Sequence, residues 1–196
     1  MPTLEPPPWG VNTPPREIVQ LEDGTPFWVG PIDKKTAREL IVANHYSRTW
    51  NTSFGTYCFG VFDGGGLVGV LVFGNLMNPD SAAMLADLPP GAITELNRMW
   101  IHDRLGPNTE TAALARAMRH LKTHNGIQLV QTFADGRLGC GTVYKAANFG
   151  YYGHDTTLFF ESRLSGEVLH GTPFTNTGGS GPPGTVPVGM MRRNLR

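Results

Sequence analysis

The chain has 196 residues, 40% of them hydrophobic and 16% charged, which fits one compact domain with tails and excludes a multi-domain machine. Sixteen lysines and arginines balance sixteen aspartates and glutamates, so net charge attracts no polyanion and nucleic-acid binding would need a local patch. The two cysteines lack metal-type spacing and no apolar run reaches the roughly 20 residues of a membrane span, so we expect a protein of a reducing cytoplasm with no membrane partner.

Proline and glycine clusters divide the chain into three predicted regions. Residues 1–31 carry eight prolines and should form an arm that packs on the domain, with only short edge-strand pieces such as Phe27–Val29. Residues 32–170 hold the patterned segments of the domain. Residues 171–196 are rich in Gly and Pro, and the stretch 171–190 lacks the means to bury a core, which predicts an extended or mobile tail.

The first half of the domain predicts a helix followed by a hairpin. Asp33 is a suitable N-cap for a helix over about 34–44, with residues 45–47 at its exit. An aromatic and β-branched stretch at 56–62, a glycine-rich turn and the apolar run 67–73 predict two paired strands, the second of them buried.

The second half alternates strands and helices. The segments are a loop over 76–92 with one helical turn, a strand over 93–101 with alternating faces, a helix from Asn108 or Thr109 to Gly126, a strand over 127–133, a short helix over 143–148, and one or two strands over 151–161. This order predicts a mixed α/β fold around one central sheet, with a parallel crossover between the strands at 93–101 and 127–133. Functional side chains should therefore gather beyond the carboxyl ends of these strands, at 101–108 and 134–141.

The first candidate site is the segment 103–109, where a strand ends and a helix begins. Gly106 permits close approach, and the free N–H groups of the helix start lie beside Arg104, a geometry that can hold a pyrophosphate. A capped helix start without a ligand explains the same residues.

The second candidate site combines His45, Tyr46, Asp135 and Tyr144, which the topology puts near one rim of the sheet. Imidazole, carboxylate and phenol groups together could form a proton-transfer relay or an N/O metal site. Taken singly, each residue has a structural alternative, because a His after a helix is commonly a cap and a Tyr on a short helix is commonly core.

The third candidate feature is a local excess of basic residues. Residues 98–145 contain seven lysines and arginines against three acidic residues, which allows a phosphate-facing strip or simply a solvated helix face. Aromatic residues at Trp50, Phe54 and Tyr57 could stack on an extruded base, although half-buried hairpin residues would give the same pattern.

Several short motifs together resemble the phage Mom DNA-modification proteins, which look like relatives of the GNAT acyltransferase fold. The motifs are His45-Tyr46-Ser47, Gly60-Val61-Phe62, Glu95-Leu96-Asn97-Arg98-Met99-Trp100-Ile101, Asn108-Thr109-Glu110-Thr111, Phe133-Ala134-Asp135 and Gly141-Thr142-Val143-Tyr144-Lys145-Ala146-Ala147-Asn148. They span about 45–153, a little over half of the chain. The resemblance implies a GNAT-like single mixed central sheet flanked by helices.

The resemblance also implies an enzyme that adds a bulky carbamoyl-containing group to N6 of adenine in DNA, which protects phage DNA from restriction in the host cytoplasm. It implies acetyl-CoA as donor and an iron ion as cofactor, with DNA as partner; a dimer is one open oligomeric state. The implied catalytic residues are His45, Tyr46, Arg98, Asp135 and Tyr144, and all of these except Arg98 are the implied metal ligands. The implied cofactor-binding residues are Trp100, Ile101, Arg104, Gly106, Asn108, Thr109 and Thr111, and the implied nucleic-acid contacts are Arg48, Trp50, Tyr57 and Lys145.

On this interpretation Asp135 takes the N6 proton, and Tyr144 either protonates a departing thiolate or binds the metal. Arg98 orients a carboxylate or phosphate, or pairs with Glu95 or Asp103. Trp50 or Tyr57 stacks on a flipped adenine. The segment 103–108 lacks the glycine-rich pattern of ordinary GNAT enzymes, and Gly139-Cys140-Gly141 lacks the His of many relatives.

Two other functions remain open at the level of sequence. The first is an ordinary GNAT N-acetyltransferase that uses acetyl-CoA on a small amine or a protein. The second is a binding module without enzymatic activity.

Overall fold

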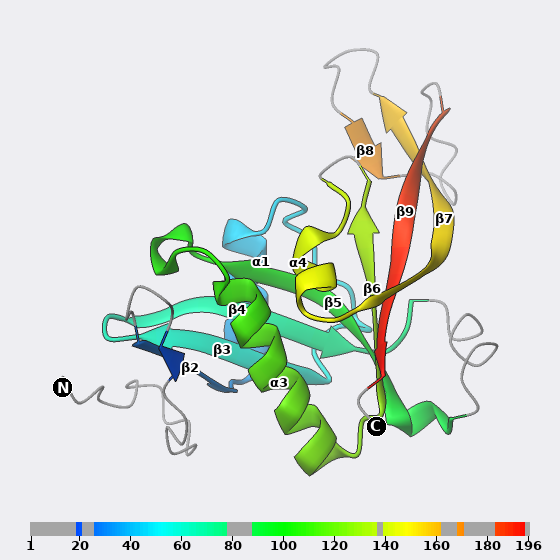
Figure 1. Ribbon diagram of the computed structural model, residues 1–196. Helices are drawn as coiled ribbons and strands as arrows, with labels where there is room; N and C mark the ends of the chain where they lie inside the picture. The colour runs from blue at the N-terminus through cyan, green and yellow to red at the C-terminus, as the bar shows by residue number, and fades with distance from the viewer. Residues whose placement is uncertain are drawn as a thin grey trace.

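The computed structural model describes residues 19–20, 26–77, 88–136, 139–161, 168–170 and 183–194 (Figure 1). Its nine-stranded sheet has the order β1-β2-β3-β4-β5-β6-β9-β7-β8. The strands are β1 Val19–Gln20, β2 Pro26–Pro31, β3 Tyr57–Asp63, β4 Gly66–Gly74, β5 Ile93–Ile101, β6 Leu129–Asp135, β7 Gly150–Glu161, β8 Val168–His170 and β9 Pro183–Asn194. The helices are α1 Lys34–Asn44, α3 Thr109–Asn125 and α4 Thr142–Ala146, and the 3-10 turns are η1 Pro90–Ala92 and η2 Asp103–Leu105.

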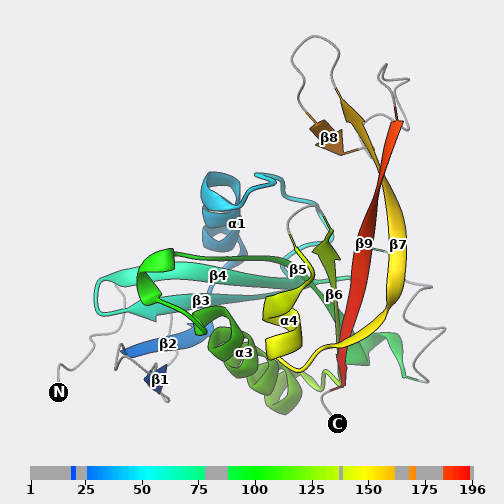
Figure 2. The ribbon, with the colours of Figure 1, turned by 45° about the horizontal axis from the view of Figure 1, so that its top comes forward.

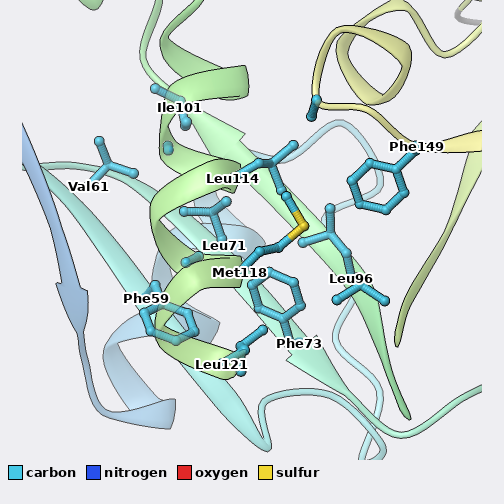
Figure 3. Close-up of a cluster of buried hydrophobic side chains, with 14 of the residues drawn as sticks. Phe59, Val61, Leu71, Phe73, Leu96, Ile101, Leu114, Met118, Leu121 and Phe149 are labelled. Carbon is cyan, nitrogen blue, oxygen red and sulfur yellow. The ribbon is translucent and has the colours of Figure 1, made fainter. Parts of the chain in front are cut away.

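Helices cover both faces of the sheet, with α1 on one side and α3 and α4 on the other (Figure 2). On the α1 side, Ala37 and Ile41 pack against Phe54, Val70 and Val72. On the α3 side a larger cluster fills the space between the helix and strands β3 to β6 (Figure 3). It includes Phe59, Leu71, Phe73, Leu96, Leu114, Met118 and Leu121. Burial of these apolar side chains holds the layers together.

The predicted helix, hairpin and crossover are confirmed. Asp33 caps α1, because its carboxylate accepts the Thr36 N–H at 2.9 Å and the Thr36 hydroxyl at 2.6 Å. Strands β3 and β4 pair as the expected hairpin, and β5 and β6 pair in parallel. The helical turn expected within 76–92 is η1, while residues 78–87 lie outside the described residues.

Both chain ends contribute more to the sheet than the sequence predicts. Residues 183–194, expected to lie within an extended tail, form β9 between β6 and β7, with the register Asp135↔Val188. In the N-terminal arm, β2 pairs with β3, and Phe27 is fully buried in the α3-side cluster. The prediction of a tail was wrong over residues 183–194, because backbone pairing on both edges stabilises a strand that has no long apolar run.

A β-bulge in β5 overturns the simple alternation expected for that strand. Val72 of β4 pairs with Arg98 and Phe73 pairs with Leu96, so Asn97 is the additional residue. Leu96 packs in the α3-side cluster, whereas the Arg98 guanidinium lies over the Phe54 ring on the α1 side. The bulge therefore turns Arg98 to the face opposite Leu96, which strict alternation does not allow.

The parallel pair β5 and β6 is short and the two strands then separate (Figure 1). Their register covers only Ile93↔Leu129, Thr94↔Val130 and Glu95↔Gln131. Beyond Glu95, β5 continues to pair with β4, while β6 pairs with β9. The β6-facing edge of the second half of β5 is thus available for other partners.

We expect Gly74→Ala to destabilise the protein by about 1–3 kcal/mol, because a Cβ there would overlap the Ser53 carbonyl and lie 3.0 Å from the Phe54 Cα. The matched control is Gly30→Ala in β2, where an added Cβ meets nothing within 4 Å. Urea denaturation of both variants measures the difference. Equal stability of the two variants would contradict this account of the β4 end.

Candidate functional site

Four of the predicted site residues come together where β5 and β6 separate. His45 and Tyr46 follow α1, Arg98 follows the bulge in β5, and Tyr144 lies on α4. The charge of Arg98 influences the ionisation of His45 and Tyr144, and Tyr46 influences both Arg98 and Tyr144. The four groups therefore form one electrostatic cluster, which we call the rim cluster.

His45 is a buried neutral imidazole, 7% exposed. Its Nδ1 lies 2.8 Å from the Ser47 hydroxyl and accepts the Ser47 backbone N–H at 3.1 Å. Burial, together with the positive charge of Arg98, lowers the pKa of His45 to about 4. The imidazole is thus uncharged at neutral pH.

Arg98 is half-buried and has an unmet hydrogen-bond donor. Its Nη1 donates to the Asn97 carbonyl at 2.6 Å and its Nη2 to the Thr49 hydroxyl at 3.2 Å. Its Cζ lies 4.6 Å from the centroid of the Phe54 ring. Among the described residues, the buried Nε has no hydrogen-bond partner and the guanidinium forms no ion pair with Glu95 or Asp103. A cation in this state can receive an anion or a polar oxygen.

The two phenols of the rim cluster differ in exposure. Tyr46 is 64% exposed, and its ring centroid lies 4.2 Å from that of His45. Tyr144 packs against Phe149, and burial raises the pKa of its phenol despite the nearby Arg98. Tyr144 also hydrogen-bonds the Thr132 side chain, whose hydroxyl donates to the Leu96 carbonyl. Tyr144 is therefore a protonated phenol at neutral pH and Tyr46 is a surface aromatic.

Asp135 is the remaining member of the predicted set. It is the last residue of β6, half-buried, and lies at the same rim as the start of the α4 loop. Its register partner is Val188 of β9, a neighbour that sequence alone did not predict.

Glu95 is a polar group that the sequence indicated only as an ion-pair partner. It is 3% exposed and lies at the last paired position before β5 and β6 separate. Its carboxylate accepts hydrogen bonds from the Met77 N–H, the Asn97 amide and the Gln131 amide at 3.1, 3.1 and 3.2 Å. Burial raises the pKa of Glu95, although the three donors oppose that shift. A carboxyl within the strand predicted over 93–101 was the signal available in the sequence.

The predicted cofactor residues lie at the carboxyl end of β5. Trp100 and Ile101, with His102 and Asp103, line an open pocket of about 180 Å³. Gly106 has a positive φ of 77°, and the buried Thr109 hydroxyl bonds back to the Leu105 and Gly106 carbonyls. Asn108 precedes α3 in the left-handed conformation without a side-chain cap, so its expected capping bond is absent there. Thr111 is half-buried in the first turn of α3.

Arg104, which the sequence placed beside the candidate pyrophosphate loop, is already bound to a carboxylate. Its Nε and Nη2 each donate at 3.0 Å to the Asp63 carboxylate in the β3–β4 turn. This exposed bidentate pair anchors η2 to the hairpin. A pyrophosphate in the loop would have to share Arg104 with Asp63.

The predicted nucleic-acid residues differ in exposure. Arg48 and Lys145 are exposed. Trp50 is half-buried, meets Phe54 edge-on at 5.8 Å and packs against the α1-side cluster, while Tyr57 packs against the α3-side cluster. These two aromatics therefore adopt the half-buried alternative. Of the seven basic residues in 98–145, Arg98, Arg104 and Arg116 are half-buried or paired, Arg119, Lys122 and Lys145 are exposed, and Arg137 lies outside the described residues.

Two of the four implied metal ligands, His45 and Tyr144, do not fit an iron site. His45 Nδ1 already accepts a backbone N–H, which leaves the proton on Nε2 and no lone pair there for a metal. Burial raises the pKa of Tyr144 and so opposes its ligation as a phenolate, and the positive charge of the adjacent Arg98 would repel a metal cation. Nor do three His, Cys, Asp or Glu side chains converge as a metal site anywhere in the part of the chain that the structure describes.

Comparisons with solved structures define the class of fold. Spermidine N-acetyltransferase from Vibrio cholerae, in complex with CoA and spermine, matches with a TM-score of 0.51 and 11% identity over 86% of this chain and 95% of that chain. Ribosomal-protein-S5-alanine acetyltransferase from Vibrio fischeri matches with a TM-score of 0.53 and 10% identity over 91% of this chain and 96% of that chain. The fold is that of the GNAT acetyltransferases, as the sequence predicted.

Sequence comparison then gives the family. A model of the Mom protein family matches residues 26–182, and the methylcarbamoylase mom of Escherichia phage Mu is 39% identical over 138 residues. That match covers 68% of this chain and 56% of the phage Mu protein. The chain belongs to the Mom protein family. Within the described ranges, none of its helices has the length and hydropathy that crossing a bilayer requires.

The buried neutral His45 predicts a specific pH dependence of stability. With a pKa of about 4 in the folded state against 6.5 for an ordinary His, the unfolded chain binds more protons between these values, so stability falls as the pH drops from about 6.5 to about 4. The full effect is of order 3 kcal/mol. Urea denaturation at pH 7.5 and 4.5 should show a smaller acid loss in His45→Gln than in the wild type. An identical loss of stability in both proteins would show that burial does not lower the pKa of the His45 imidazole.

Proposed function

We propose that the protein is a transferase that modifies N6 of adenine in DNA with a carbonyl-containing group. The observation that carries this proposal is the rim cluster, at the point where β5 and β6 separate. The chain that carries this cluster belongs to the Mom family and has the fold of GNAT acetyltransferases. The cluster offers a cation with an unmet donor, a neutral imidazole and a protonated phenol. Groups of this kind stabilise charge and transfer protons in acyl transfer.

A CoA-type donor is proposed to bind along the separated edge of β5. Backbone pairing with β6 ends at Glu95, beyond which the Leu96 carbonyl accepts the Thr132 hydroxyl, and such an edge can accept the amides of an extended ligand. The pocket at Trp100–Asp103 continues this edge toward the start of α3, whose N–H groups favour an anion. The solved relative from Vibrio cholerae holds CoA, and the Salmonella typhimurium yncA structure holds acetyl-CoA, which supports this class of donor.

For the transfer step we assign one proton movement to each of two residues. The adenine N6 attacks the carbonyl carbon, the N6–C bond forms, and Asp135 accepts the N6 proton. With a CoA thioester as donor, the bond from that carbon to sulfur would break, and the protonated Tyr144 would donate its proton to the departing thiolate. Arg98 orients an oxygen of the donor or of a phosphate through its unmet Nε.

The composition of the donor decides which product forms. An acetyl group supplies a methyl and a carbonyl carbon but no nitrogen, so simple transfer from acetyl-CoA yields N6-acetyladenine. A methylcarbamoyl group, the one in the name of the phage Mu relative, contains one additional NH. A carbamoyl product therefore needs a nitrogen-containing donor or co-substrate, and the mass of the modified nucleoside distinguishes the two products.

DNA is proposed to approach the exposed side of the rim cluster. Adenine N6 lies inside the duplex, so the base must be extruded. Tyr46 is the best-exposed aromatic of the cluster and is better placed for stacking than the half-buried Trp50 or Tyr57. Arg48 and Lys145 are exposed beside this region and can contact phosphates.

The central prediction concerns modified adenine in cellular DNA. Digested DNA from cells that express the chain should contain a new adenosine derivative by mass spectrometry. Asp135→Ala and Tyr144→Phe should reduce its yield by about 10²–10⁴-fold, the typical effect of losing a general base or acid. Tyr151→Phe, at an exposed tyrosine of β7, is the matched control and should retain the wild-type yield.

Two outcomes would contradict the proposed function. Unmodified DNA together with an acetylated small amine would favour an ordinary acetyltransferase. A biological effect that survives both Asp135→Ala and Tyr144→Phe would favour a binding module without enzymatic activity.

The proposed donor site predicts a fluorescence response to CoA. Trp100 is half-buried and lines the pocket, so CoA should change the protein's tryptophan emission. Trp100→Phe should abolish this change. Trp28→Phe should retain it, because the Trp28 indole lies in β2 and stacks on Phe62 of β3. Binding by equilibrium dialysis without any change in Trp100 emission would place CoA elsewhere.

A further inference from the structure

The turn after α1 folds two hydroxyls back toward His45. The Arg48 N–H donates to the His45 carbonyl at 2.9 Å, and Arg48 has a positive φ of 47°, which is uncommon for a residue other than glycine. This tight turn places Ser47 and Thr49 on the path between His45 and Arg98.

The hydroxyls form a continuous hydrogen-bond chain from the guanidinium to the imidazole. Arg98 Nη2 donates to Thr49 Oγ1 at 3.2 Å, and Thr49 Oγ1 donates to Ser47 Oγ at 3.2 Å. Ser47 Oγ lies 2.8 Å from His45 Nδ1. A guanidinium has only donors, so Thr49 must accept from it and can pass its own hydrogen to Ser47.

The direction of this chain determines the tautomer of His45. The Ser47 hydroxyl has its hydrogen available for Nδ1, and the Ser47 backbone N–H donates to the same nitrogen at 3.1 Å. A backbone N–H cannot accept, so Nδ1 must be the unprotonated nitrogen. The proton of the neutral ring then lies on Nε2, which makes no hydrogen bond within the described residues.

We propose that Ser47 and Thr49 are positioning residues that hold His45 as an Nε2–H hydrogen-bond donor and link it to Arg98. In this state His45 cannot take a proton through Nε2. It can instead donate a hydrogen bond to the carbonyl oxygen of the transferred group, where negative charge develops as N6 attacks. This catalytic part rests on the proposed function, whereas the hydrogen-bond chain and the tautomer do not.

The tautomer can be measured without DNA or donor. In ¹⁵N-histidine-labelled protein at pH 7.5, the His45 resonances should show a protonated Nε2 and an unprotonated Nδ1. Ser47→Ala should move the Nδ1 shift toward that of an unbonded imidazole nitrogen, and Thr49→Val should do so to a smaller extent. Ser53→Ala and Thr52→Val, in the adjacent turn and outside the chain of hydroxyls, are the matched controls and should leave both shifts unchanged. Amide spectra confirm that each variant is folded.

Kinetics test the positioning role. Ser47→Ala and Thr49→Val should each lower kcat by about tenfold with little change in KM, as expected for the loss of one orienting hydrogen bond, and the two control variants should not. A protonated Nδ1 in the wild type, or Nδ1 shifts in Ser47→Ala that match those in Ser53→Ala, would overturn the proposal. If the Nε2–H tautomer is found but no adenine modification, the proposed function fails while the hydrogen-bond chain stands.

Discussion

The separation of β5 from β6 is the constraint on which the whole site depends. Both strands are paired through Glu95↔Gln131 and then follow different neighbours, β5 with β4 and β6 with β9. The buried Glu95 carboxylate fixes this point, because it binds the Gln131 amide across the pair and the Met77 N–H of the preceding loop. Three donors around one desolvated carboxylate make the junction costly to rearrange.

The bulge at Asn97 works together with this separation. It reverses the side on which Arg98 emerges, so the guanidinium meets Phe54 and Thr49 on the α1 side rather than the core under α3. Tyr144 reaches the same region from α4, and His45 reaches it from the end of α1. Three elements, α1, β5 and α4, thus supply the four residues of the rim cluster, and none of them could assemble it alone. This arrangement explains why a small domain without net charge can present a concentrated polar site.

The chain combines membership of the Mom family with the fold of GNAT acetyltransferases. The donor set at the rim cluster favours proton transfer and hydrogen bonding over metal binding, because its imidazole is held with Nδ1 as an acceptor and its buried phenol is protonated. Arg104 is held by the Asp63 carboxylate, so the phosphate binding proposed at the start of α3 would depend mainly on backbone N–H groups.

Local patterns in the sequence determined α1 with its Asp33 cap, the β3–β4 hairpin and the parallel crossover, because capping, turn chemistry and hydrophobic periodicity act over a few residues. The motifs around His45, Arg98 and Tyr144 also pointed to the correct family. Only the tertiary structure decided that residues 183–194 enter the sheet beside Asp135, that Asn97 forms a bulge, and that Trp50 and Tyr57 pack inward. Each of these depends on partners that are distant along the chain, and strand pairing and burial between such partners leave no periodic signal in either segment.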